Sequence, residues 1–151
     1  MPSEHRATVR WERTTTDFDA KTFDRNHVIE YDGGEHVRAS TGPDYGGDPA
    51  CVDPEQGLVG ALASCHMLTF LTVAAIRKLV VDRYEDAAYA EVGKNAAGKM
   101  MVSRMVLRPR VVFGGPVQPD AATVTALHEK AHANCFIANS VRSEVSVEPQ
   151  C

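Results

Sequence analysis

Two cysteines have sequence contexts that could support thiol chemistry. Cys65 lies inside a run from Gly57 to Ile76 in which no residue carries a fixed charge, and His66 follows it directly. Cys135 lies in the segment A-H-A-N-C-F-I-A-N-S-V, near the end of the chain. A thiol in a buried helix is either an inert small apolar side chain or a deliberately placed nucleophile. The residues beside Cys65 leave both interpretations open.

A nucleophilic Cys65 needs a lowered pKa. With the ordinary value of about 8.5, a thiol is only about 3% thiolate at pH 7. We expect a nearby cation to lower the pKa. The neighbouring His66 is not assigned this role, because adjacent positions on a helix point about 100° apart.

A second candidate site is a literal H-E-x-x-H motif formed by His128, Glu129 and His132 on a predicted helix. On a helix this spacing can place two zinc ligands on one face beside a general base. The extended zincin pattern is absent, and only Glu144 and Glu148 follow as acidic candidates for a third ligand. We therefore interpret the motif as the solvated face of a helix, expect no bound metal, and keep a zinc hydrolase as a minor alternative.

The stretch from Pro54 to Val81 is predicted to be the central helix, and it must position Cys65. Its apolar residues are not confined to one face, which predicts a helix buried nearly all round. Small residues recur at a spacing of four, as Gly57 with Ala61 and Gly60 with Ser64, so another backbone can approach closely. Close packing against the chain's own sheet and packing against a second copy both remain open.

The remaining elements alternate in strand fashion or have helix chemistry. Strands are predicted at 8–14, 27–31, 36–40, 83–92, 100–113 and 139–147, with a long loop at 42–54 and a second helix at 119–134. The order βββ-α-ββ-α-β places strands in antiparallel runs, which is typical of the α+β class. We expect one domain over residues 1–151.

Composition and charge exclude several classes of protein. The 16 Lys and Arg against 20 Asp and Glu give a net charge of -4, and the basic residues are scattered, so nucleic acid is not an expected partner. The polar N-terminus lacks the apolar region of a secretory signal, which predicts a cytoplasmic protein. The hydroxyl residues of the uncharged run and its lack of an aromatic belt argue against a membrane span.

The sequence resembles the OsmC/Ohr family of thiol-dependent hydroperoxide reductases. The resemblance rests on S-C-H-M-L-T-F-L around the first cysteine, A-H-A-N-C-F-I-A-N-S-V around the second, and P-E-Q ten residues before the first. Element order and length agree over essentially the whole chain. The resemblance implies an OsmC-like fold assembled as an intertwined homodimer, with the two central helices packed together. It also implies a thiol peroxidase that needs no cofactor and acts on organic hydroperoxides.

The resemblance assigns roles to four residues. It makes Cys65 the peroxidatic residue and Cys135 the resolving residue, which captures the oxidised thiol as an intramolecular disulfide. A dithiol, such as the dihydrolipoyl group of a lipoylated protein, would reduce that disulfide. Arg25 is the expected cation, with Arg38 as a competing candidate, and Glu55 is expected to orient the arginine.

The role of Glu55 requires a particular arrangement. In one straight helix, a residue ten positions from Cys65 lies about 15 Å away along the axis. The two residues could share a site only if the helix breaks at Gly57 or Gly60, or if a partner subunit contributes. A glutamate in the first turn is also favoured by the helix dipole alone.

The two other cysteines, Cys51 and Cys151, are interpreted as incidental thiols. Four cysteines in a reducing compartment are expected to be free or redox-active rather than a structural disulfide framework. A non-enzymatic thiol sensor or small-molecule binding module on the same fold remains the alternative to an enzyme, because a fold does not by itself confer an activity.

Overall fold

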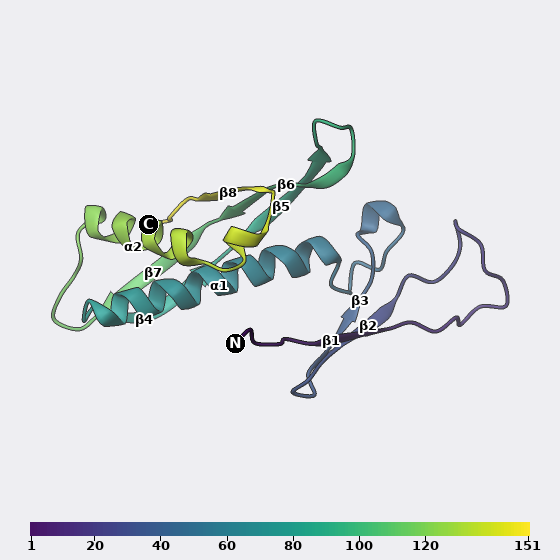
Figure 1. Cartoon of the computed structure of the whole chain (residues 1–151), viewed down its shortest axis with the longest axis horizontal. Helices are drawn as coiled ribbons and strands as arrows, with labels where there is room; N and C mark the ends of the chain where they lie inside the picture. The colour runs from purple at the N-terminus through teal and green to yellow at the C-terminus, as the bar shows by residue number, and fades with distance from the viewer. The chain divides into compact units, whose positions relative to one another are not determined.

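The computed structural model describes residues 1–151, which form two compact units, Met1–Gly57 and Leu58–Cys151 (Figure 1). The observed element order is βββ-α-ββββ-α-β, so the predicted α+β class is confirmed. The prediction of one domain over residues 1–151 stays a prediction.

The N-terminal unit is built on a three-stranded antiparallel sheet. Its strands are β1 (Ala7–Arg10), β2 (His27–Tyr31) and β3 (His36–Ala39), in that spatial order. The turn between β2 and β3 contains Gly34 at φ 93°, a left-handed conformation that glycine adopts without strain. The three strands predicted in this region are therefore confirmed, although β1 ends four residues before Thr14. A short 3-10 helix, η1 (Pro43–Tyr45), lies in the loop that follows.

Local sequence fixes both ends of helix α1 (Pro54–Ile76). At its start, the Gln56 backbone N–H donates to the Asp53 carboxylate at 2.8 Å, and the Asp53 N–H donates to the Gln56 side-chain oxygen at 3.0 Å. These reciprocal bonds form a capping box. Just past its end, Lys78 adopts φ 58° and reverses the chain. The predicted extension of the helix to Val81 is therefore wrong.

Within one chain, α1 buries a single stripe rather than its whole circumference. The buried residues follow helical spacing: Val59, Leu62, His66, Phe70, Val73 and Ala74. The opposite side is exposed and includes Gly60, Ala61 and Ser64, with Leu68 at 58% exposure and Ile76 at 75%. The expectation of a helix buried nearly all round is thus wrong for the single chain. By length and composition alone α1 could cross a membrane, but its buried stripe makes it a core helix.

Helix α1 is also continuous at both glycines of its first two turns. It runs through Gly57 and Gly60 without interruption. A chain break at either glycine was one of the two routes by which Glu55 could reach the site of Cys65, and that route is closed.

The C-terminal unit contains two sheets. Strands β4 (Val80–Asp86) and β7 (Pro109–Gly114) form an antiparallel pair. Strand β6 (Met100–Leu107) lies between β5 (Tyr89–Lys94), to which it is antiparallel, and β8 (Glu144–Val147), to which it is parallel. The β5–β6 connection is a tight turn from Asn95 to Gly98.

The two long strands predicted at 83–92 and 100–113 are each broken into two. The first breaks after Asp86 and the second at Arg108, so that each half pairs in a different sheet. The Asp86 carboxylate accepts a 2.7 Å hydrogen bond from the Arg108 backbone N–H, which joins the two breaks. Pro109 follows and has no N–H to donate to a strand ladder. The two predicted strands still pair with each other in antiparallel fashion, β4 with β7 and β5 with β6, but in two sheets rather than as two continuous strands.

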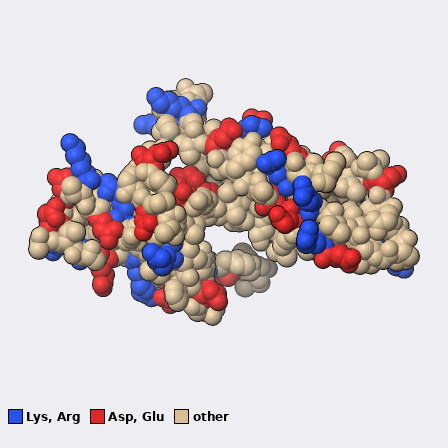
Figure 2. Space-filling view, turned by 180° about the vertical axis from the view of Figure 1, so that it is seen from behind, with Lys and Arg blue, Asp and Glu red and all other residues tan.

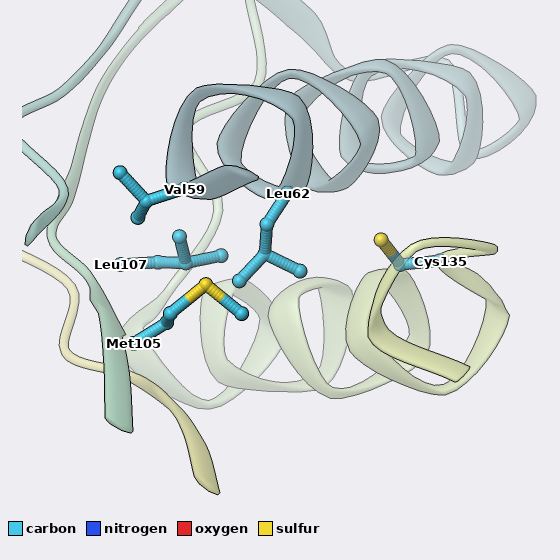
Figure 3. Packing of buried hydrophobic residues seen from close by; sticks show 5 residues of the cluster. All are labelled: Val59, Leu62, Met105, Leu107 and Cys135. Atoms are coloured by element: carbon cyan, nitrogen blue, oxygen red, sulfur yellow. The ribbon is translucent and has the colours of Figure 1, made fainter. Parts of the chain in front are cut away.

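Two apolar clusters form the core of the C-terminal unit. Figure 3 shows the first, in which Leu62 of α1 points toward Met105 and Leu107 of β6; it also contains Val59 and Cys135. The second joins α1 to helix α2 (Ala121–Asn134) through Phe70, Val73, Ala74, Leu127 and Ala131. Asp120 caps α2, accepting from the Thr123 N–H at 2.8 Å. A 3-10 helix, η2 (Ala138–Ser140), follows α2.

Charged side chains are interspersed on the face shown in Figure 2. Blue Lys and Arg atoms lie among red Asp and Glu atoms, and no continuous basic patch covers this face. This distribution agrees with the scattered basic residues of the sequence, which do not favour a nucleic acid partner.

Candidate active site

Cys65 lies on α1 at the edge of a cavity. The thiol is half-buried, and the cavity has a volume of about 450 Å³. Its wall comes from α1 and from the segment that ends α2: Ala61, Ser64, Cys65, Leu68, Thr69, Asn134, Phe136 and Ile137. A reactant could therefore approach the Cys65 sulfur from this cavity.

Cys135 directly follows α2 and is fully buried. Its sulfur accepts a hydrogen bond from the Ala138 backbone N–H, with a nitrogen–sulfur distance of 3.4 Å. Cys65 packs against the apolar cluster that contains Cys135. The structure thus brings the two predicted thiols together, although 70 positions separate them in the sequence.

The surroundings of the two thiols shift their pKa values in opposite directions. Burial raises the pKa of Cys65, but hydrogen bonds from the Cys135 thiol and from the backbone N–H groups of Ile137 and Phe136 outweigh it and lower the pKa. For Cys135, burial raises the pKa, and the contact with Cys65 raises it further. Cys65 is therefore the more acidic of the two thiols, and Cys135 the less acidic.

The backbone donors at Phe136 and Ile137 are functional groups that the sequence analysis missed. The role of the expected cation stays a prediction; these two N–H groups and the Cys135 thiol also lower the pKa of Cys65. Every residue except proline carries an N–H, so no side-chain pattern could have marked these two positions.

Arg25 belongs to the N-terminal unit, where its guanidinium is partly bound. Two of its N–H groups donate to the carbonyl oxygens of Phe23 at 2.7 Å and Ala20 at 2.8 Å. The guanidinium carbon lies 4.1 Å from the centre of the Phe23 ring. Arg25 also lines a cavity of about 380 Å³, together with Trp11 and Phe18.

The remaining predicted residues have simple surroundings. Glu55 is half-buried in the first turn of α1 and forms no ion pair, with Arg25 or any other residue. The competing Arg38 lies 3.9 Å from the Asp48 carboxylate on the surface. The roles of Arg25 and Glu55 stay predictions. Cys51 is buried, Cys151 is exposed, and all four cysteines are free.

The H-E-x-x-H motif is not a solvated face, which corrects our interpretation. Glu129 is exposed, but His128 is only 4% exposed. The reason is a contact from another element: the His128 Nδ1 lies 3.0 Å from the Nε2 of His66, which is fully buried on α1. No group of three or more His, Cys, Asp or Glu side chains is arranged to hold a metal ion.

Burial keeps this histidine pair neutral. Loss of hydration lowers the pKa of His66 from 6.5 to about 4, and the nearby His128 and His132 lower it as well. Loss of hydration alone lowers the pKa of His128 to about 4. In the unfolded chain both rings would titrate near their ordinary value of about 6.5.

Stability is therefore expected to fall as the pH drops below about 6.5. Between pH 6.5 and 4 the unfolded chain binds more protons than the folded chain, so each histidine contributes stability that is present above this window and lost within it. Within this window, each histidine can lower the free energy of unfolding by at most about 1.4 kcal/mol per pH unit. Denaturant unfolding at pH 7.5, 6.5 and 5.5 would measure the effect. The His128→Asn variant should show a shallower slope, and equal stability at all three pH values would contradict the prediction.

The α+β fold holds two thiols close together, Cys65 on α1 and the buried Cys135 directly after α2, as expected for a two-cysteine thiol protein. The chain belongs to the OsmC-like protein family, whose family model matches residues 46–150. The family recognised from the two cysteine segments is thereby confirmed, as is the predicted OsmC-like fold with a long central helix.

Solved structures give the same fold. An OsmC-like protein of unknown function from Vibrio cholerae is 44% identical, with a TM-score of 0.95 over 99% of this chain and 100% of that chain. The organic hydroperoxide resistance protein OhrB of Bacillus subtilis is 18% identical, with a TM-score of 0.71 over 98% of each chain. A putative organic hydroperoxide resistance protein from Vibrio cholerae, solved with captopril in one active site, is 22% identical, with a TM-score of 0.70 over 97% of this chain and 92% of that chain. No curated protein matches the sequence.

Proposed function

We propose that this protein is a thiol-dependent peroxidase that reduces organic hydroperoxides, with Cys65 as the peroxidatic residue and Cys135 as the resolving residue. The observation that carries the proposal is the unequal pair of thiols. The pKa of Cys65 is lowered and that of Cys135 is raised, partly by the same contact. The names of several proteins with the same fold, which describe organic hydroperoxide resistance, support the substrate class.

The proposed reaction has two steps. The Cys65 thiolate attacks the terminal oxygen of the hydroperoxide, the O–O bond breaks, and the alkoxide leaves and takes up a proton to become the alcohol. The sulfur is oxidised to a sulfenic acid. The Cys135 sulfur then attacks the Cys65 sulfur, which forms the disulfide and releases water. A dithiol, such as a dihydrolipoyl group, would restore both thiols by exchange.

The wall of the Cys65 cavity favours a substrate with an apolar group. Leu68 and Phe136 both line it, and Phe136 is 82% exposed. An apolar substituent that packs on these side chains would be removed from water. This burial would favour binding by about 25 cal/mol for each square ångström of apolar surface. Hydrogen peroxide has no such group, so we expect a preference for organic hydroperoxides.

Arg25 and Glu55 belong to the proposal as residues whose roles come from the family resemblance. A guanidinium has five N–H donors, and two of those of Arg25 are bound to carbonyl oxygens. The remaining donors suit the oxygens of a peroxide. We propose that Arg25 holds the substrate oxygens. We also propose that Glu55 orients the Arg25 guanidinium, in a site to which a partner subunit contributes. A cytoplasmic location would keep the dithiol reductant available.

The expected result of a peroxidase assay is sustained turnover. With cumene hydroperoxide and excess dihydrolipoamide, the protein should consume many equivalents of peroxide, and cumene hydroperoxide should react at least about tenfold faster than hydrogen peroxide, a difference of about 1.4 kcal/mol. Peroxide loss is followed by a ferric–xylenol orange assay. A single stoichiometric oxidation without cycling would contradict the enzyme and support a thiol sensor on this fold.

We also propose that the protein is a homodimer in which the exposed faces of two α1 helices pack together. The exposed face combines small residues, Gly60, Ala61 and Ser64, with the apolar Leu68 and Ile76. Ala61, Ser64 and Leu68 also line the Cys65 cavity, so in the proposed dimer the partner helix would lie beside this cavity and close one side of it. Small side chains let two helix backbones approach closely, and an exposed apolar face of this kind is typical of an interaction site.

The dimer is tested by light scattering with a matched pair of variants. The parent should have twice the 16.4 kDa mass of one chain. A side chain at Gly60 meets nothing within 4 Å in the single chain, so Gly60→Leu should leave the chain folded but shift it toward the monomer. Gly98, in the exposed β5–β6 turn, offers the control Gly98→Asn, which should stay dimeric. A monomeric parent at micromolar concentration would contradict the dimer.

A further inference from the structure

The buried hydrogen bond between His66 and His128 connects the two helices that carry the thiol site. Their nitrogens are 3.0 Å apart, and their rings are nearly parallel, with centroids at 5.3 Å and an interplanar angle of 9°. His66 directly follows Cys65 on α1. His128 lies on α2, seven positions before Cys135. The proposed thiol chemistry uses neither ring.

The histidine pair is energetically unfavourable if its only role is to stabilise the fold. In a hydrogen bond between two neutral imidazoles, one ring donates its N–H and the other accepts with its unprotonated nitrogen. The two facing nitrogens therefore share a single proton. The outer nitrogens, His66 Nδ1 and His128 Nε2, are buried and have no hydrogen-bond partner. A buried polar atom left without a partner costs about 1–3 kcal/mol, so two apolar side chains could fill this space at lower cost. We therefore expect the pair to serve a purpose other than stability, namely to fix the positions of the two helices that it connects.

The pair lies where it can set the position of α1 against the end of α2. Cys65 lines the same cavity as Phe136 and Ile137, which follow α2, and the backbone N–H groups of these two residues help to lower the pKa of Cys65. Hydrogen bonds weaken steeply when distance and angle change. Because neighbouring positions on a helix point about 100° apart, His66 can bind α2 while Cys65 faces the turn after it. The Phe70 ring, one turn further along α1, lies 4.4 Å from the His128 ring and adds a second contact between the same helices.

We propose that His66 and His128 are positioning residues that hold α1 and α2 in the register at which Cys65 reaches the N–H groups of Phe136 and Ile137. The inference rests on the proposed role of Cys65 as the reactive thiol. It assigns the histidines no contact with substrate. Their effect on the thiol is exerted through the two helices.

The test compares variants that keep the hydrogen bond with variants that lose it. His66→Gln can place a polar atom near the lost Nε2, and His128→Asn can place one near the lost Nδ1, so this double variant should keep the contact. The double variant His66→Leu and His128→Leu keeps apolar volume and removes the contact. His36→Leu, at an exposed position of β3, is the control.

The measurement is the rate at which iodoacetamide alkylates Cys65 between pH 5.5 and 9, read by peptide mass. In the leucine pair, Cys65 should lose its contact with the Phe136 and Ile137 N–H groups. The Cys65 pKa should then rise by about one unit, and alkylation at pH 6 should slow about tenfold. The Gln/Asn pair should stay within about twofold of the parent, and His36→Leu should match the parent. Thermal unfolding followed by circular dichroism verifies that each variant is folded.

Two results would overturn the proposal. The first is a folded leucine pair with the alkylation profile of the parent, which would reduce the contact to packing. The second is a Gln/Asn pair that reacts as slowly as the leucine pair. If the leucine pair does not fold, His128→Asn is compared with His128→Ala, and equal profiles overturn the proposal. The alkylation rate reports the reactivity of the Cys65 thiol and does not depend on peroxide turnover. A wrong positioning role for the histidines can therefore be distinguished from a lack of peroxidase activity.

Discussion

The Cys65→Ser variant is expected to lose hydroperoxide turnover completely, down to the rate of the protein-free reaction. Serine has nearly the same shape, so the helix and the cavity should persist. A hydroxyl is not oxidised by a peroxide, and it ionises far less readily than a thiol. The neighbouring Cys135 is fully buried and its pKa is raised, so it does not replace Cys65 as the nucleophile. The measurement is the consumption of cumene hydroperoxide with dihydrolipoamide as reductant.

The matched controls are Cys51→Ser and Cys151→Ser. Neither thiol contributes to the Cys65 cavity, so both variants should retain the turnover of the parent within about twofold. Substantial turnover by Cys65→Ser would mean that another thiol is the nucleophile, and the proposed assignment would fail even if the protein is a peroxidase.

The Cys135→Ser variant is expected to keep the first oxidation and lose the second step. Attack on the peroxide needs only the Cys65 thiolate, whereas capture of the sulfenic acid needs the second thiol. After one equivalent of peroxide, intact mass should show the loss of two hydrogens in the parent and the gain of one oxygen in the variant. Excess peroxide should carry the variant on to the sulfinic acid.

One effect could obscure this result. The Cys135 thiol also donates a hydrogen bond to Cys65, so its removal should slow the first oxidation at pH 7 as well. The serine hydroxyl can still donate, and we therefore expect a loss of only a few fold in the first step, against loss of the disulfide altogether. If peptide mapping of the oxidised parent places the disulfide at Cys51 or Cys151, the resolving role of Cys135 is wrong.

Local signals in the sequence predicted the elements that deliver the two thiols. The central helix was predicted to begin at Pro54, where α1 begins, and the uncharged run that follows contains Cys65. The predicted second helix ends at Asn134, as observed, so that Cys135 directly follows it. These features depend on residues within a few positions of one another, which is why the sequence was sufficient.

Contacts between distant segments account for the errors. The split of each long strand depends on the bond between Asp86 and the Arg108 backbone, 22 positions apart. The burial of His128 depends on His66, 62 positions away, and its charged neighbours on the helix favoured the opposite interpretation. The continuous apolar run of α1 predicts a helix, as observed, but apolar residues alone do not indicate that one side of this helix is exposed in the single chain.

The position of the two thiols in the chain gives the oxidised protein a distinct topology. Strands β4 to β7 and all of α2 lie between Cys65 and Cys135, so a disulfide would close these 70 positions into a covalent ring. Strand β8 lies outside the ring, yet pairs with β6 inside it. Ring closure of this length would restrict the unfolded chain by roughly 4 kcal/mol. A protease that nicks the exposed turn from Asn95 to Gly98 would open the ring without releasing a fragment, and the two pieces would separate only after reduction and unfolding.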